Sequence, residues 1–178
     1  MIEIFYYSFS SDDQNPIFIF DRDDTLIKDI HSLNNADDIE WLPDRLDNLK
    51  KLSDLNIHIA IVTNQAKIGR GEISLFDYFN LTNYLTEQLR SIGVNLWAII
   101  TCPHSPEANC DCRKPKPGML NSILTRIPMT NNKIVFLGDK LTDVQSATNA
   151  SRTIDAEMIS KDAINFTQVI SKWIEKFL

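Results

Sequence analysis

The sequence predicts one α/β domain over residues 1–178, of the Rossmann-like three-layer kind with a central parallel sheet. Short runs of apolar, β-favouring residues alternate with segments whose apolar residues recur at helical spacing. Strands that alternate with helices are typical of a parallel sheet covered by helices on both faces. A length of 178 residues, 43% of them hydrophobic, suits a single domain with a substantial core.

Four segments are expected to be buried strands, and five are expected to be helices. The predicted strands are residues 17–20, 57–62, 94–101 and 133–137, with 152–154 as a candidate short fifth strand. The predicted helices are residues 43–55, 74–91, a segment of about ten residues led by Pro117, a short one at 141–150, and 162–177. Residues 1–16 form a polar N-terminal extension whose aromatic run is a candidate edge strand. The mostly polar stretch 28–41 is expected to be a long loop on the functional side of the sheet.

The composition of the chain argues against several classes of protein. The net charge of −6 argues against a general nucleic-acid surface, and we expect no nucleic-acid partner. No window is apolar enough to span a membrane, and the N-terminus lacks the features of a signal peptide, so a cytoplasmic location and no membrane partner are expected. Three cysteines do not suggest a disulfide framework. A monomer is the default expectation.

The first predicted strand ends in two carboxylates, Asp21 and Asp23, followed by Thr25. Ligands of open α/β sheets bind outside the carboxyl ends of the strands, where these side chains are expected. Two neighbouring carboxylates need either a cation between them or a raised pKa on one of them. The alternative is an acidic turn without a function, because Asp is also a favoured turn residue.

Other strand ends add polar groups to the same crevice. The second predicted strand ends in Thr63 and Asn64, and the fourth in Asp139, with Asp143 four residues on. Carboxylates from separate strand ends suit a hard cation such as Mg²⁺ that also engages a phosphate. A hydroxyl, an amide and Lys114 suit the oxygens of a transferring phosphoryl group, and an aspartate can form an aspartyl phosphate. The joint pattern predicts phosphoryl-transfer chemistry.

A second constellation lies in residues 102–112, where Cys102 and His104 are followed by Cys110 and Cys112. Three cysteines and one histidine form a Cys₃His set, which is typical of a structural Zn²⁺ site with no open position for a catalytic water. The alternative is three free thiols in a loop beside a solvated histidine. Because Lys114 follows this loop closely, a bound Zn²⁺ would help to position phosphate-binding groups.

The order of these elements resembles the haloacid dehalogenase-like phosphatase superfamily. The resemblance rests on the segment from Asp21 to Thr25, on Thr63, on Lys114, and on the segment from Gly138 to Asp143. It implies that Asp21 is the nucleophile, that Asp23 is the general acid and base, and that Thr63 and Lys114 hold the phosphoryl oxygens. It also implies a Mg²⁺ site made by the Asp21 carboxylate, the Asp23 carbonyl and Asp139, with Lys140 beside it.

The Cys/His loop and the Arg113–Pro115 segment resemble a branch of the superfamily that lacks a large cap domain. The branch holds D-glycero-D-manno-heptose 1,7-bisphosphate 7-phosphatase and the histidinol-phosphate phosphatase domain. The segments 63–71 and 113–120 lean toward the heptose enzyme, whereas the short gap between His104 and Cys110 looks more like the histidinol-phosphate domain. The resemblance implies a small sugar-phosphate substrate. The candidate substrate-binding residues are Asn64, Gln65, Arg70 and Arg113.

The predicted function is therefore Mg²⁺-dependent hydrolysis of a phosphomonoester through an aspartyl phosphate, with a heptose bisphosphate as the expected substrate. Histidinol phosphate or another small sugar phosphate is the alternative. A 3′-phosphatase acting on DNA ends is a more distant one, because the chain is acidic and lacks a basic, aromatic-lined stretch. The alternative of another class is a catalytically silent, zinc-stabilised binding module.

Overall fold

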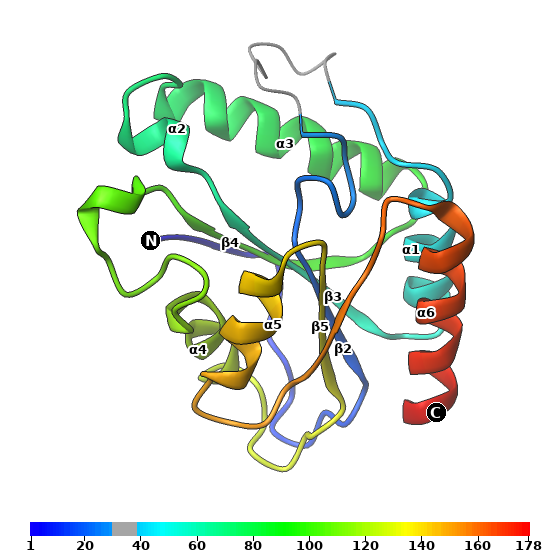
Figure 1. Cartoon of the computed structure of the whole chain (residues 1–178). Coiled ribbons are helices and arrows are strands. Elements are labelled where there is room, and N and C mark those ends of the chain that lie inside the picture. Colours follow the sequence, from blue (N-terminus) through cyan, green and yellow to red (C-terminus); the bar gives the residue numbers. More distant parts are fainter. Residues whose placement is uncertain (30–38) are drawn as a thin grey trace.

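The computed structural model describes residues 1–29 and 39–178, and a six-stranded sheet forms its centre (Figure 1). The strand order is β1-β4-β3-β2-β5-β6, in which only β1 runs antiparallel to its neighbour. The strands are β1 (Ile2–Phe5), β2 (Ile17–Phe20), β3 (His58–Asn64), β4 (Leu96–Cys102), β5 (Ile134–Gly138) and β6 (Asp155–Met158). Of the parallel strands, β4, β3, β2 and β5 are the buried ones, as expected for strands covered on both faces.

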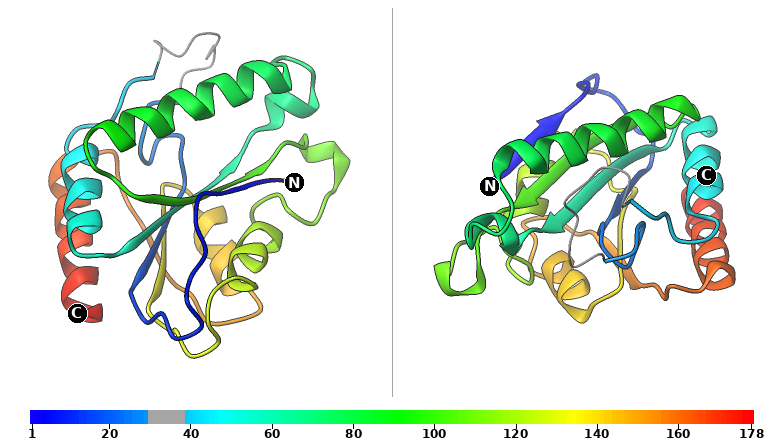
Figure 2. Two further views of the ribbon diagram at one scale, coloured as in Figure 1. Left: turned by 180° about the vertical axis from the view of Figure 1, so that it is seen from behind. Right: turned by 90° about the horizontal axis from the view of Figure 1, so that it is seen from above.

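Helices lie on both sides of this sheet (Figure 2). They are α1 (Arg45–Asp54), α2 (Ala66–Gly69), α3 (Leu75–Ser91), α4 (Gly118–Leu124), α5 (Leu141–Thr148) and α6 (Ala163–Phe177), with a 3₁₀ turn at Pro106–Ala108. Ser74 and Asp162 begin α3 and α6 as N-caps, because each side chain accepts a backbone N–H of the first turn. The Ser74 cap confirms the predicted start of α3.

Each face of the sheet has its own apolar core because side chains alternate along a strand. Phe18 and Phe20 of β2 pack into the core that α1, α3 and α6 cover. Ile17 and Ile19 pack into the opposite core, which α4 and α5 cover. The predicted three-layer α/β architecture is confirmed.

The last predicted strand was placed wrongly. Residues 152–154 are not extended in the sheet; Arg152 instead donates to the carbonyls of Pro128 and Asn131, and β6 begins at Asp155. The alternation of half-buried residues in β6 is weak, with Met158 exposed at its end. An edge strand of this kind gives little periodic signal.

The N-terminal extension packs across the edge of the sheet, and its aromatic run contains the predicted edge strand, β1. The ring of Phe9 lies between Trp97 and His58, at centroid distances of 4.2 and 4.4 Å. Both nitrogens of the His58 ring are paired, one with the Tyr7 hydroxyl at 2.9 Å and the other with Asp13 at 3.0 Å. These contacts fasten the extension to the N-terminal end of β3.

Residues 30–38 of the predicted long loop 28–41 lie outside the described residues, so its expected contribution to the substrate site stays a prediction. No described helix has the length and apolar character needed to cross a bilayer.

Candidate active site

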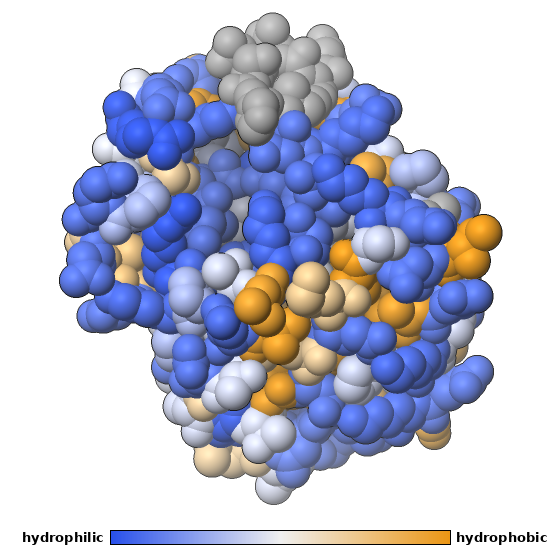
Figure 3. All heavy atoms as spheres, viewed as in Figure 1, coloured by the Kyte–Doolittle hydropathy of each residue, from blue (hydrophilic) through white to orange (hydrophobic). Residues whose placement is uncertain are grey.

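A cavity of about 310 Å³ opens at the carboxyl ends of the parallel strands. Asp21 and Asp23 reach it from the end of β2, and Thr63 from the end of β3. Lys114 comes from the loop after β4, and Asp143 from the first turn of α5. Hydrophilic residues dominate this hollowed part of the surface in Figure 3. The cavity has the position that the parallel-sheet rule predicts.

Lys114 is a buried cation held between two carboxylates on the floor of the cavity. Its Nζ lies 2.6 Å from Asp21 Oδ1 and 2.7 Å from Asp143 Oδ1, and all three side chains are less than 8% exposed. Burial raises the pKa of Asp21, and the ammonium of Lys114 acts in the opposite direction. The two carboxylates raise the pKa of Lys114 against its own burial. A nucleophilic carboxylate beside a fixed cation suits attack on an anionic phosphate.

Asp143 is held in this cluster by its own backbone surroundings. Its Oδ2 accepts the Lys140 amide at 2.9 Å at the start of α5. A Cβ built on Gly138 would lie only 2.3 Å from the same oxygen. The glycine at the end of β5 therefore leaves the room that the Asp143 carboxylate occupies. No role was predicted for Asp143 from the sequence.

Asp23 has a different set of partners. Arg22 donates from Nε to Asp23 Oδ1 at 2.9 Å and from Nη2 to Oδ2 at 3.0 Å. Gln65 Nε2 donates to Asp23 Oδ2 at 2.6 Å and to Thr63 Oγ1 at 2.9 Å. A hydrogen-bonded chain thus links the end of β2 to the end of β3.

The backbone of Lys114 is fixed by Asn64 at the end of β3. The Asn64 side chain accepts the Lys114 N–H at 3.2 Å and donates to the Lys114 carbonyl at 3.3 Å. Lys114 Nζ also donates to the Val62 carbonyl at 3.1 Å. Asn64 was predicted to bind substrate; it lines the cavity, but both ends of its amide are paired with the protein backbone.

Three carboxylates, two that line the cavity and one beside it, fit a hard cation. One oxygen from each of Asp21, Asp139 and Asp143 can be chosen so that all lie within 4.8 Å of one another. Asp139 Oδ1 is buried and has no hydrogen-bond partner among the described residues. An unpaired buried carboxylate oxygen is costly unless something binds it, so this donor set suits Mg²⁺. Lys140 Nζ lies 3.6 Å from Asp139 Oδ2, which is the neighbouring position that the resemblance implies.

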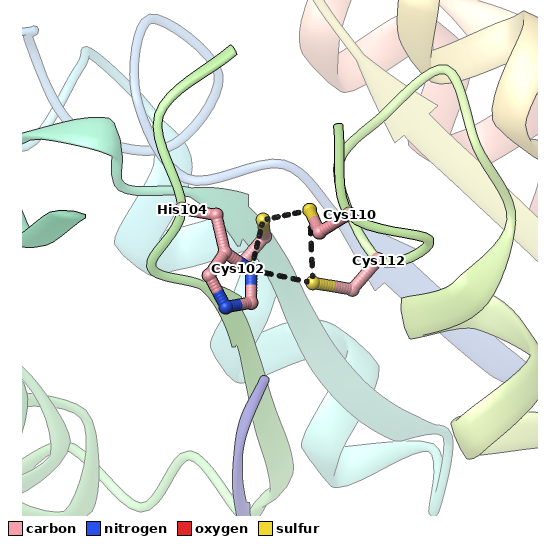
Figure 4. A group of neighbouring side chains, drawn as sticks. All are labelled: Cys102, His104, Cys110 and Cys112. Atoms are coloured by element: carbon pink, nitrogen blue, oxygen red, sulfur yellow. Dashed lines mark hydrogen bonds between the residues drawn. The ribbon is translucent and has the colours of Figure 1, made fainter. Parts of the chain in front are cut away.

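The structure brings the four predicted zinc ligands together (Figure 4). Cys110 Sγ lies 3.6 Å from Cys102 Sγ and 3.5 Å from Cys112 Sγ. His104 Nδ1 lies 3.7 Å from Cys102 Sγ and 3.3 Å from Cys112 Sγ. A tetrahedral zinc with bonds of about 2.3 Å separates its sulfur ligands by roughly 3.7 Å, so the spacing fits one shared metal and not a disulfide.

Two glycines allow α2 and α4 to approach the backbone of this Cys/His loop closely. A Cβ on Gly69 of α2 would lie 2.6 Å from the Pro103 carbonyl, and a Cβ on Gly118 of α4 would lie 2.4 Å from the Asp111 carbonyl. The loop is therefore clamped between α2 and α4, close to Lys114. The short helix α2 was not predicted.

Of the remaining predicted substrate-binding residues, two line the cavity and one does not. Gln65 and Arg70 line the cavity, and Arg70 is paired with Glu72 at its rim. Arg113 does not line it, because its guanidinium donates to the His104 carbonyl at 3.3 Å within the Cys/His loop. Lys67 lines the cavity as well, and no role was predicted for it from the sequence.

A family model described as polynucleotide kinase 3 phosphatase matches residues 16–168. This chain belongs to that phosphatase family. The match covers every element from β2 to the first part of α6, and with them the side chains of the cavity and of the Cys/His loop. The extension before residue 16 precedes the matched region of the phosphatase family.

Several proteins of similar sequence are named heptose bisphosphate phosphatases. The chain is 33% identical over 141 residues to D-glycero-alpha-D-manno-heptose-1,7-bisphosphate 7-phosphatase of Photorhabdus laumondii, a match that covers 75% of this chain and 77% of that one. It is 32% identical over 143 residues to the beta-anomer phosphatase of Escherichia coli K12, covering 76% and 75% of the two chains.

A solved structure supports the fold. The D,D-heptose 1,7-bisphosphate phosphatase of B. bronchiseptica, complexed with magnesium and phosphate, superposes with a TM-score of 0.79 at 23% identity and covers 90% of this chain and 99% of that one. The predicted resemblance to the haloacid dehalogenase-like phosphatases is confirmed by these matches.

Proposed function

We propose that this protein hydrolyses a phosphomonoester through an aspartyl phosphate on Asp21, and that its substrate is D-glycero-D-manno-heptose 1,7-bisphosphate, cleaved at the 7-phosphate. The observation that carries the proposal is the pairing at the cavity floor. Asp21 lies against the buried Lys114, while Asp23, two residues on, faces the same cavity with separate partners. One strand end thus presents two carboxylates in different electrostatic surroundings, which suits two different roles.

In the proposed reaction, an oxygen of Asp21 forms a bond to phosphorus as the bond from phosphorus to the sugar oxygen breaks. Asp23 gives its proton to the departing sugar oxygen. It then takes a proton from the water that attacks the aspartyl phosphate, which releases inorganic phosphate and regenerates Asp21. Lys114 and the Thr63 hydroxyl stabilise the charge on the phosphoryl oxygens.

Mg²⁺ is the cofactor that we propose for the cavity. Asp21 and Asp139 would hold it with the Asp23 carbonyl, and Asp143 contributes a nearby carboxylate. When bound, it would screen the repulsion between Asp21 and the substrate phosphate. The partnerless oxygen of Asp139 supports this assignment, as does the magnesium named in the B. bronchiseptica complex.

We propose a structural Zn²⁺ at Cys102, His104, Cys110 and Cys112. Four protein ligands leave no position for a reacting water, so the metal would fix the loop and not take part in the reaction. Its effect on catalysis would pass through the backbone of Lys114, two residues after the last ligand. The site would then have the same role that the sequence pattern predicts.

The proposed substrate rests on the names of the relatives and on individual cations that line the cavity beside its carboxylates. Arg70, Lys67 and Lys140 line it in addition to Lys114, and cations of this kind suit a substrate with a second phosphate. We further propose that the enzyme acts in the cytoplasm as a monomer. A polynucleotide 3′-phosphate is the second candidate, because the family model carries that description.

The test is phosphate release in the presence of Mg²⁺ from both anomers of the heptose bisphosphate, histidinol phosphate and a 3′-phosphorylated DNA strand. A preference of about a hundredfold in kcat/KM, roughly 2.7 kcal/mol of transition-state binding, would assign the substrate. The proposal expects one heptose anomer to be preferred, and expects Asp21→Asn to abolish release from every substrate. A stronger preference for histidinol phosphate or for DNA would overturn the substrate assignment. Folded, metal-loaded protein that releases no phosphate would favour the silent binding module.

A further inference from the structure

We propose that Arg22 is a positioning residue that fixes the carboxylate of Asp23 for proton transfer to the leaving group. The inference rests on the proposed function, since it takes Asp23 as the general acid and base. Arg22 lies between the two aspartates in the sequence, and the sequence pattern predicts no role for it.

The contact between the two side chains is bidentate. Arg22 reaches both oxygens of Asp23: Nε lies 2.9 Å from Oδ1, and Nη2 lies 2.8 Å from Oδ1 and 3.0 Å from Oδ2. Two nitrogens of one planar guanidinium that contact both oxygens restrict the orientation of a carboxylate as well as its position, which a lysine cannot do. Gln65 adds a third hydrogen bond, at 2.6 Å to Oδ2, from the end of the neighbouring strand. The Asp23 carboxylate is therefore oriented by three donors.

The guanidinium lies in surroundings that make this pairing hard to replace. Arg22 is 5% exposed, and it lines a small enclosed space together with Ile61 of β3, Tyr78 and Leu85 of α3, and Ile99 of β4. Ile61, Leu85 and Ile99 are apolar neighbours, while Arg22 also lines the active-site cavity. A buried guanidinium needs acceptors for its N–H groups, because a buried donor left without a hydrogen bond costs about 1–3 kcal/mol. The carboxyl oxygens of Asp23 accept these hydrogen bonds.

The arrangement also gives Asp21 and Asp23 different cationic partners, which suits their two different roles in the proposed reaction. Asp21 is paired with Lys114, and Asp23 is paired with Arg22, so each carboxylate has a cation of its own. If Asp23 turned toward Lys114, the buried guanidinium would lose the acceptors of its side-chain hydrogen bonds. Arg22 thus holds Asp23 out of the Lys114 cluster, where it remains available to the leaving oxygen at the cavity.

The test compares two leaving groups on Arg22→Gln and Arg22→Lys. Heptose bisphosphate has an alkoxide leaving group that needs a proton, whereas 4-nitrophenyl phosphate releases a phenolate that does not. Single-turnover cleavage of the first and the nitrophenolate burst from the second both report phosphorylation of Asp21. Arg152→Gln is the matched control, since the Arg152 guanidinium binds backbone carbonyls far from the cavity. Thermal melts establish that each variant is folded.

The proposal expects Arg22→Gln to slow cleavage of the heptose bisphosphate by about tenfold to a hundredfold with KM within about twofold. The nitrophenolate burst should stay within about twofold of the wild-type rate, and Arg22→Lys should lie between Gln and wild type. Equal losses on both substrates, no loss on either, or failure of both variants to fold would overturn the inference and leave Arg22 a structural residue. Wild-type protein that cleaves neither substrate would instead refute the proposed function, and the inference with it.

Discussion

At the scale of single residues, the site depends on small spaces kept open beside charged side chains. Gly138 is the clearest case, because any side chain at this position would meet the Asp143 carboxylate. That carboxylate pairs with Lys114, which in turn pairs with Asp21. A change at the end of β5 is therefore expected to reach the nucleophile through two ionic contacts.

We predict that Gly138→Ala lowers both stability and activity. Overpacking at a buried position costs about 1–3 kcal/mol, and displacement of Asp143 would loosen the hold on Lys114. Thermal melting and phosphate release measure the two effects. Gly93→Ala is the control, because its added Cβ would meet only the flexible end of Lys50, although its positive φ is itself strained. Equal activity in the two variants would contradict this account of Gly138.

At the scale of elements, the Cys/His loop links α2, α4 and the Lys114 backbone. The Cys/His loop contains no helix or strand beyond one 3₁₀ turn. A bound metal would therefore give the loop the rigidity that secondary structure does not supply. The sequence could predict this loop well, because the ligand types and their spacing are local. It could not predict the clamp by Gly69 and Gly118, which depends on contacts between distant segments.

We predict that Cys110→Ser removes bound zinc and lowers Tm. Loss of a structural metal costs roughly 3 kcal/mol or more, which corresponds to about 6–12 °C in a chain of this size. Zinc content by mass spectrometry and a thermal melt are the measurements. Glu107→Gln, an exposed change in the same loop, should leave both unaltered. A Cys110→Ser protein with unchanged Tm would favour the free-thiol interpretation.

The N-terminal extension is a second element with a testable anchor. Burial lowers the pKa of His58, against the opposing pull of Asp13. The folded state then binds fewer protons than the unfolded state when the pH falls below about 6.5, so stability is present above that value and is lost as the pH falls through the folded pKa of His58. Denaturant unfolding between pH 7.5 and pH 5 should show this decline. The decline should be smaller in His58→Gln, and an identical decline in that variant would exclude His58 as its cause.

At the scale of the whole molecule, the sequence predicted the layers and the strand-end crevice because buried strands leave continuous apolar runs. β2 and β3 are examples, and both end in residues of the cavity. It misplaced β6, whose half-buried residues carry no strong period. It also missed the role of Arg22 and the backbone contacts of Asn64, because hydrogen bonds between the ends of separate strands leave no pattern in the chain.

The most direct test of the account is detection of phosphate on Asp21. The enzyme would be mixed with Mg²⁺ and substrate, quenched in acid within milliseconds, digested, and analysed by mass spectrometry. We expect phosphate on the peptide that contains Asp21 and none in Asp21→Asn. With 4-nitrophenyl phosphate, whose leaving group needs no proton, we expect a larger amount in Asp23→Asn because hydrolysis of the intermediate then lacks its base. Rapid turnover by an enzyme in which no phosphorylated peptide is found, in the wild type or in Asp23→Asn, would contradict the proposed role of Asp21.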